Sequence, residues 1–238
     1  MNVSNFKYYF NNYYYRIYER LFPDSRSQKE AKFLTKFIKS KNSRILDFGC
    51  AWGRHLKALA SMGYRDLIGV DFSDKLLDKA RANLTNIQGA KLINTDLVSF
   101  KSNKKFDFIY HIFQSFGHED KNYDQKTLLK VRKLLSNDGK YLLDLRNPIK
   151  LMNNEKFDLP GGVTVEAHYD KKRHREKFVY RFDREQQFVE FNVYTKQELT
   201  RMLQKAGLQL VKFFGDFSGI PYGVNSERLI IVAKKAKN

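Results

Sequence analysis

The chain has 238 residues, of which 42% are hydrophobic and 15% aromatic, which is enough to bury the core of one folded domain and excludes a disordered chain. Its longest aliphatic runs are too short to span a bilayer, and its N-terminus lacks the basic start and apolar stretch of a secretion signal. The single cysteine, Cys50, excludes an internal disulfide and is typical of a reducing compartment. We therefore expect a cytoplasmic protein that makes no membrane contact.

The formal net charge of +18 has two interpretations. A basic surface is typical of proteins that bind nucleic acid, an acidic membrane or an anionic substrate. The alternative is compositional bias, because the charges are scattered and the only dense basic cluster is Lys171 to Arg175. Scattered charge favours a solvated surface over a binding stripe.

Residues 1–42 predict a helical lid. Apolar residues recur at three- and four-residue spacing along a first helix, which we expect to end at Pro23, and a second helix follows up to about Ser40. One helix cannot bury all six tyrosines between Tyr8 and Tyr18. Tyr14 and Tyr18 share a face, so they either help to cover a site or pack against the sheet with their hydroxyls in water.

Residues 43–150 alternate short apolar runs with helical patterns, which predicts a parallel sheet covered by helices on both faces. The expected strands are Arg44–Phe48, Leu67–Val70, Lys91–Asn94, Phe106–Tyr110 and Lys140–Leu145. The expected helices are Arg54–Ser61, Lys75–Leu84 and Tyr123–Leu135. Asn137 to Gly139 predicts a tight turn before the fifth strand.

The rest of the chain predicts two further parts of one domain. Residues 151–194 change to a period of two, which indicates antiparallel β-hairpins inserted in the sheet order. In residues 195–238, Thr195 and Glu198 form a capping box for a helix that stops at Gly207. Two strands follow, and they suit a sheet closed by an antiparallel last strand.

The segment from Ile45 to His55 carries the main chemical signal. A strand that ends in Asp47 runs into a turn of small residues that opens a helix. Small residues let the backbone approach a ligand closely, and the helix N-terminus offers free N–H groups. The candidate binding residues in this turn are Asp47, Gly49, Cys50, Ala51 and Gly53.

Acids also follow the second and third predicted strands. Asp71 is placed to accept both hydroxyls of a ribose, and Phe72 to lie against an adenine ring. Asp96 can accept from the adenine amino group, with the N–H of Leu97 near the ring. Each acid alone is equally explained as a turn or cap residue. The series of three favours a nucleoside site, because the ends of such strands converge on one crevice.

The turn from Asp47 to Gly53 resembles the glycine-rich first motif of class I S-adenosylmethionine (SAM)-dependent methyltransferases. Gln114 to His118 resembles the segment after the fourth strand in a bacterial and archaeal subgroup in which Ser-Phe-Gly is typical. The resemblance implies an α/β fold with a Rossmann-like seven-stranded sheet and antiparallel last strand, SAM as cofactor and methyl transfer as the reaction. Ala51 stands where a glycine is usual, and we expect its φ to stay negative.

Methyl transfer needs a positioned and desolvated nucleophile, because the cofactor supplies the electrophile. His118 is the candidate base or substrate orienter and His111 a candidate pocket and cofactor residue, since both follow the fourth strand. Either histidine can equally be structural. Tyr14 and Tyr18 are the other candidates near the reaction. The dispersed histidines and single cysteine show no spacing typical of a metal site, and Cys50 has no paired base.

Three functions remain open. The first is a methyltransferase for nitrogen or oxygen of a small molecule, acting as a monomer or homodimer. The second is a methyltransferase for RNA or another large anionic target, which the net charge suggests. The third is a dehydrogenase or nucleotide sensor, although the spacing Gly49-x-Ala51-x-Gly53 does not match Gly-x-Gly-x-x-Gly.

Overall fold

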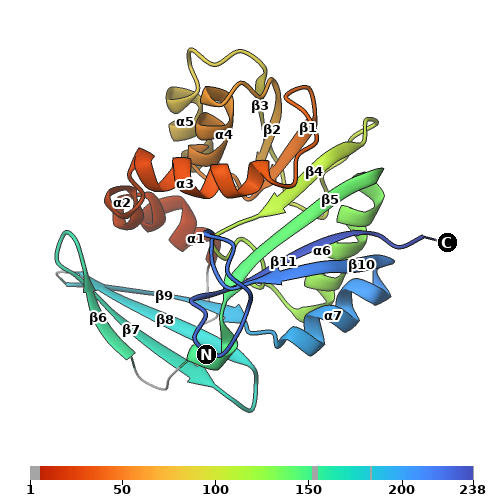
Figure 1. The fold of residues 1–238 in the computed structure, drawn as a ribbon. Coiled ribbons are helices and arrows are strands. Elements are labelled where there is room, and N and C mark those ends of the chain that lie inside the picture. Colours follow the sequence, from red (N-terminus) through yellow and green to blue (C-terminus); the bar gives the residue numbers. More distant parts are fainter. Residues whose placement is uncertain (1–5, 152–154, 183, 238) are drawn as a thin grey trace.

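A computed structural model describes residues 6–151, 155–182 and 184–237. Its largest element is a seven-stranded sheet of order β10-β11-β5-β4-β1-β2-β3 (Figure 1). The strands are β1 (Arg44–Phe48), β2 (Asp66–Asp71), β3 (Ala90–Asn94), β4 (Phe106–His111), β5 (Leu135–Arg146), β10 (Leu208–Phe214) and β11 (Arg228–Lys235). β11 is antiparallel to both of its neighbours, while β1 to β5 pair in parallel. The predicted Rossmann-like sheet with an antiparallel last strand is confirmed.

Helices cover both faces of this sheet, as the alternating pattern predicted. α3 (Asp24–Thr35), α4 (Arg54–Ser61) and α5 (Asp74–Asn83) pack on one face. α6 (Lys121–Leu134) and α7 (Lys196–Lys205) pack on the other. The predicted capping box starts α7, where the hydroxyl of Thr195 accepts from the N–H of Glu198 and the Glu198 carboxylate accepts in return.

A second, smaller sheet lies beside the carboxyl ends of the central strands, below the N-terminal helix in Figure 1. Its order is β6-β7-β8-β9, formed by β6 (Glu155–Leu159), β7 (Val163–Asp170), β8 (Arg175–Phe182) and β9 (Glu185–Asn192). The hairpins are therefore present, but they do not enter the order of the main sheet as predicted. Their alternating apolar face packs against the N-terminal helix, which gives them a core of their own.

The N-terminal helix changes its winding along its length. It comprises α1 (Phe6–Tyr9), a π-helical turn η1 (Phe10–Tyr14), α2 (Tyr15–Tyr18) and a 3₁₀ turn η2 (Glu19–Leu21). Pro23 ends it and precedes α3, as predicted. A short 3₁₀ turn, η3 (Pro148–Lys150), follows β5.

Two sequence-based predictions about the strands are wrong or incomplete. Residues 137–139 lie inside β5 rather than in a turn before it, and the pairing of β4 with β5 shifts register there, from Phe106↔Leu135 to Phe108↔Lys140. β6 was not predicted, because it is only five residues long and lies between a polar stretch and the Gly161–Gly162 turn region, which leaves little room for a period-two pattern. In the part of the chain that the structure describes, no helix has the length and apolarity to cross a bilayer. The start of the chain, residues 1–5, lies outside the described residues.

Candidate active site

The loop between β1 and α4 is wound through left-handed conformations. The φ angles are +80° at Gly49, +47° at Ala51 and +75° at Gly53. A Cβ at Gly49 would lie 2.5 Å from the Cβ of Ser115, so only glycine fits there. The expectation of a negative φ at Ala51 is wrong. Its N–H donates to Asp71 at 2.9 Å, and this bond holds the alanine in the strained turn.

Two acids from the sequence analysis are buried at this loop. The carboxylate of Asp71 accepts from the N–H groups of Ala51 and Ser73, each at 2.9 Å. Burial raises its pKa to about 6 although these bonds oppose the shift. Asp47 is 2% exposed, and burial raises its pKa to about 7 against the opposing effects of Tyr110 and Arg54. Its Oδ2 atom makes no hydrogen bond within the described part of the chain.

The third acid, Asp96, lies at the other end of the crevice. Its Oδ1 accepts from the N–H of Val98 at 2.9 Å and its Oδ2 from the hydroxyl of Tyr123 at 2.7 Å. Asp96 therefore already holds its own turn together. Its Oδ1 also accepts from the N–H of Ser99 at 3.3 Å, so a lone pair remains on Oδ2 for a further donor, because a carboxylate has about four acceptor positions.

These strand ends line two small cavities that adjoin one another. A cavity of about 60 Å³ includes Gly49, Ala51 and Asp71, and a cavity of about 50 Å³ includes Asp96. Both cavities are lined by Phe72, Leu97, Ser115 and His118. We call these two cavities the cofactor crevice. Of the predicted cofactor residues, Asp47, Cys50, Gly53 and His111 do not line it.

The N-terminal helix covers the cofactor crevice with aromatic side chains. Phe6 lines one of the two cavities, and Phe10 and Tyr14 line the other. The rings of Phe6 and Phe10 lie edge-on to Phe72, with centroids 5.5 and 6.0 Å away. This is the position that a lid requires.

His118 lies in the crevice beneath this helix. Its ring stacks on Phe6 with centroids 5.5 Å apart and lies 4.8 Å from Phe10 and 4.6 Å from Phe191. Neither ring nitrogen has a hydrogen-bond partner in the described structure, and burial lowers its pKa to about 3. The imidazole is therefore neutral near pH 7 and a weak base.

His111 and Cys50 lie in the core instead. His111 is fully buried, and its Nδ1 pairs with the hydroxyl of Tyr141 at 2.9 Å. Burial also raises the pKa of the Cys50 thiol well above its ordinary value, which leaves it inert as a nucleophile. Among the described residues, no three His, Cys, Asp or Glu side chains gather as metal ligands would.

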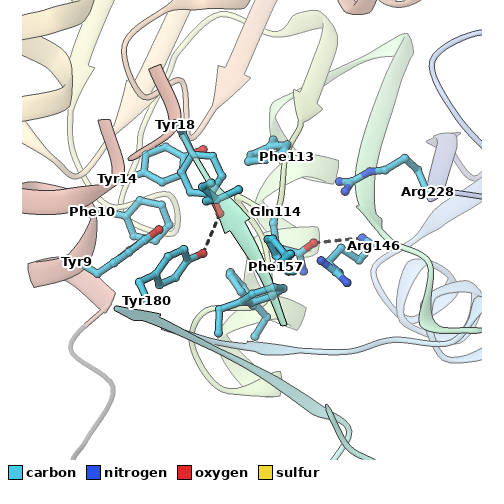
Figure 2. A pocket seen from close by; sticks show the side chains of 13 residues that line it. Tyr9, Phe10, Tyr14, Tyr18, Phe113, Gln114, Arg146, Phe157, Tyr180 and Arg228 are labelled. Atoms are coloured by element: carbon cyan, nitrogen blue, oxygen red, sulfur yellow. Dashed lines mark hydrogen bonds between the residues drawn. The ribbon is translucent and has the colours of Figure 1, made fainter. Parts of the chain in front are cut away.

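A larger cavity of about 210 Å³ adjoins the crevice (Figure 2). We call it the acceptor cavity. Four residues line both spaces and lie at the boundary between them, which we call the neck: Phe10, Tyr14, Phe113 and Gln114. Tyr18 also lines the acceptor cavity, and its hydroxyl lies 2.8 Å from that of Tyr180 on β8, so the expectation of a water-exposed hydroxyl does not hold for Tyr18.

Sequence reasoning missed Gln114, Arg146 and Arg228, which line the acceptor cavity. Gln114 follows Phe113 in a second left-handed pair, with φ angles of +64° and +56°. Its side-chain oxygen accepts from the N–H of Arg146 at 3.1 Å. No periodic pattern marks this loop, and the two arginines come together only through the antiparallel pairing of β11 with β5.

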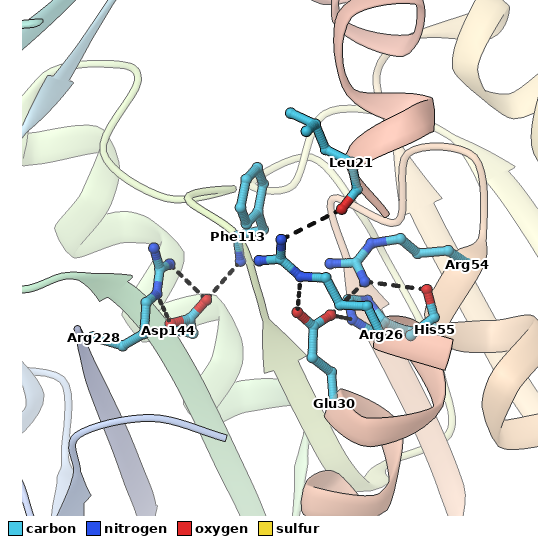
Figure 3. Close-up of polar contacts among 9 residues, drawn as sticks. Leu21, Arg26, Glu30, Arg54, His55, Phe113, Asp144 and Arg228 are labelled. Carbon is cyan, nitrogen blue, oxygen red and sulfur yellow. Dashed lines mark hydrogen bonds and ion pairs between the residues drawn. The ribbon is translucent and has the colours of Figure 1, made fainter. Parts of the chain in front are cut away.

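A buried ionic cluster ties α3 to α4 beside the site (Figure 3). Glu30 binds Arg54, His55 at 2.9 Å and Arg26 at 3.0 Å. Burial alone would raise the pKa of Glu30, but the hydrogen bond from His55 and the charge of Arg54 outweigh it and hold that pKa well below its usual value. His55 thus joins the helices rather than reaching the crevice.

Comparisons with known proteins agree with this geometry. Residues 45–139 match the family model of the methyltransferase domain. A protein of Geobacillus sp. (strain WCH70) with a provisional methyltransferase name is 24% identical over 92% of this chain and 96% of its own length. The family match and this relative support a methyltransferase domain at residues 45–139.

Three solved structures share the fold. The CcbJ methyltransferase of Streptomyces caelestis has a TM-score of 0.83 at 17% identity, covering 96% of this chain and 98% of that one. A SAM-dependent methyltransferase of Clostridium acetobutylicum ATCC 824 has a TM-score of 0.78 at 17% identity, covering 95% and 99%. SAM-bound CalS10 of Micromonospora echinaspora, an amino pentose methyltransferase, has a TM-score of 0.68 at 18% identity, covering 94% and 99%. The chain thus has the class I SAM-dependent methyltransferase fold, built around a methyltransferase domain at residues 45–139.

Proposed function

We propose that this chain transfers the methyl group of SAM to a nitrogen or oxygen atom of a small molecule. The neck between the cofactor crevice and the acceptor cavity carries the proposal. A cavity of about 210 Å³, lined by side chains of both sheets and the N-terminal helix, suits a small acceptor rather than a folded macromolecule. An amino pentose, the acceptor of the structurally similar CalS10, belongs to that size class.

The residues of the crevice fit SAM. We infer that Asp71 accepts from the ribose hydroxyls and that Asp96 with Leu97 binds the adenine edge, because these residues line the two adjoining cavities. The glycine turn allows the methionine part of SAM to approach the backbone closely. The Oδ2 atom of Asp47, which has no hydrogen-bond partner in the described structure, can accept from N–H groups of this loop when a ligand is bound. When bound, SAM supplies an electrophilic methyl group.

The chain itself positions the acceptor and excludes water. Of the described residues that line the acceptor cavity, none is a carboxylate or histidine. Burial raises the pKa of both Tyr14 and Tyr18, so their hydroxyls stay neutral and act as hydrogen-bond donors or acceptors. With its low pKa, His118 fits the role of orienter better than that of base. An amine acceptor must therefore enter unprotonated and release its proton after transfer.

Two further parts of this proposal rest on the sequence. We infer membership of the Ser-Phe-Gly subgroup, supported by Ser115, whose hydroxyl donates to the carbonyl of Phe48 at 3.0 Å and seats this segment against the crevice. We also infer a cytoplasmic location from the single reduced cysteine, and action as a monomer or homodimer.

Calorimetry with S-adenosylhomocysteine tests the cofactor site, and labelled SAM with a panel of small amines and hydroxyl compounds tests transfer. We expect micromolar binding of S-adenosylhomocysteine, on the order of other cofactor sites. Tyr14→Phe, Tyr18→Phe and His118→Asn should each lower kcat/KM about 10-fold or more. Tyr15→Phe is the matched control, because Tyr15 packs on Trp52 outside both cavities. Absence of binding at millimolar concentration would refute the proposal.

A further inference from the structure

Two arginines face one another at the outer end of the acceptor cavity. Arg146 on β5 and Arg228 on β11 are direct partners in the antiparallel register. Like charges opposite one another destabilise a sheet unless other groups compensate them. The pair therefore needs groups within the protein that compensate its charge, and its presence at the cavity calls for a functional explanation.

Buried carboxylates anchor each guanidinium along one edge. The Nε and Nη2 atoms of Arg228 each donate to Asp144 at 2.7 Å, and Asp144 is fully buried. The Nε of Arg146 lies 3.2 Å from Glu176, which is 2% exposed, and its Nη2 lies 3.6 Å from Glu155. Within the described residues, neither Nη1 atom donates to a protein group. The guanidinium of Arg228 is thus fixed by two hydrogen bonds, while that of Arg146 lies in ion-pair contact with two carboxylates, and each keeps one donor edge free.

The carboxylates that pair with the two arginines lie outside the acceptor cavity. The side chains that line the acceptor cavity include Arg146 and Arg228 and, in the described chain, no carboxylate. Both arginines also line a wider outer cavity of about 690 Å³, together with the cations Arg26 and Lys150 and the carboxylates Glu155 and Glu227. Figure 3 shows Phe113 between Arg26 and Arg228, and each guanidinium lies 5.8 Å from the centre of its ring. Arg146 and Arg228 thus lie at the boundary between the outer cavity and the acceptor cavity.

We propose that Arg146 and Arg228 bind an anionic group of the acceptor, a carboxylate or a phosphate, while the nucleophilic atom reaches the neck at Tyr14 and Gln114. The proposal rests on the methyltransferase function proposed above and narrows its substrate class to acidic small molecules. Planar guanidinium groups match the paired oxygens of both anions. The expected acceptor is bipolar, with an amine or hydroxyl at one end and the anion at the other.

Anion binding is measurable before any acceptor is known. Protein saturated with S-adenosylhomocysteine is titrated by calorimetry at low salt with sodium succinate and, separately, with sodium pyrophosphate. Low salt is required because exposed charge interactions are screened beyond about 10 Å at 0.1 M. We expect one site per chain, and the tighter of the two probes identifies the anion as carboxylate or phosphate.

Three variants assign the site. Arg146→Gln and Arg228→Lys should each weaken the binding of the tighter probe at least about tenfold, because each removes a guanidinium fork. Arg181→Gln is the matched control: Arg181 is a half-exposed arginine on β8, paired with Glu166 and absent from the cavity linings, so this change should leave the affinity unaltered. The affinity for S-adenosylhomocysteine shows that each variant is folded.

The outcomes separate the two proposals. If the wild type binds S-adenosylhomocysteine but neither probe, or if all three variants weaken the probe equally, the arginine pair is not an anion site while the methyltransferase proposal stands. If S-adenosylhomocysteine itself does not bind, the proposed function fails first. Saturable binding that disappears only in Arg146→Gln and Arg228→Lys supports the assignment.

Discussion

At the scale of the residue, Ala51 shows how the cofactor loop stores strain. It has a φ of +47°, in a region that costs an L-amino acid about 1 kcal/mol or more. We expect Ala51→Gly to raise the free energy of unfolding by about 0.5–1 kcal/mol, the relief being partly offset by greater freedom of the unfolded chain. Urea denaturation measures this change. The same substitution at Ala60, inside α4, should lower stability by about 1 kcal/mol. A loss at both positions would contradict strain at Ala51.

Asp47 predicts a pH dependence of stability. Burial raises its pKa in the folded protein to about 7, so the folded state holds a proton that the unfolded state has released. The contribution of Asp47 to the free energy of unfolding should therefore fall as the pH rises from about 4 to 7. Asp47→Asn removes the cost of burying the charge, and we expect a gain of about 1 kcal/mol or more at pH 8 that shrinks at pH 5.

The comparison at two pH values distinguishes this effect from a change in packing. Asp107→Asn serves as the control. Asp107 lies on β4, next to β1 but away from the crevice, and it accepts from the N–H of Arg44 at 2.9 Å. That variant should lose stability at both pH values. A destabilised Asp47→Asn variant at pH 8 would show that the carboxylate is charged and well compensated.

At the scale of the element, the π-helical turn Phe10–Tyr14 decides what the N-terminal helix presents to the site. One extra residue per turn is typical of functional positions, and here it brings Phe10 and Tyr14 together at the neck. Deleting Asn11 should restore a regular α-helix and shorten the spacing of Phe10 and Tyr14 from four residues to three, which separates the two rings at the neck. We expect methyl transfer to fall at least about tenfold, since misplaced positioning groups are costly.

The affinity for S-adenosylhomocysteine gives the second readout of this deletion. Asp71, Asp96 and the glycine turn lie outside the helix that carries the deletion. Cofactor binding should therefore weaken far less than methyl transfer. Replacing Asn11 by Ala keeps the length of the helix and is the control. Equal activity of the deletion and the replacement would show that the π turn has no part in the site.

The same element marks where sequence reasoning stops. Strand β1 and helix α4 have the predicted bounds, because a buried strand, a small-residue turn and an amphipathic helix each leave a local pattern. The position of the cofactor crevice could be predicted for the same reason, because each strand that ends there has a local sequence pattern. The neck did not, because a π turn and the left-handed Phe113–Gln114 pair have no periodicity, and Tyr180 reaches Tyr18 only through packing between distant segments. His111 looked accessible by its position in the chain, yet pairing within the core buries it.

At the scale of the whole molecule, the charge of +18 and the enclosed acceptor cavity lead to different expectations. Charge attracts polyanions to any part of the surface, whereas the acceptor cavity has a volume of only about 210 Å³. Weak, salt-sensitive binding of RNA is therefore compatible with an enzyme that does not methylate it. The arginine pair reconciles the two features, because a basic field concentrates a small acidic acceptor at the outer cavity.

The net charge also predicts how salt changes stability. With 44 lysines and arginines against 26 acids, the folded chain repels itself more than the expanded chain does. Screening by salt should therefore raise Tm by several degrees, with most of the rise below about 150 mM, where the Debye length falls to about 8 Å. Differential scanning fluorimetry in sodium chloride from about 20 to 500 mM measures it. The buried Glu30 cluster is shielded from solvent and should not reverse the trend. A Tm that is flat or falls over this range would mean that surface ion pairs already balance the charge.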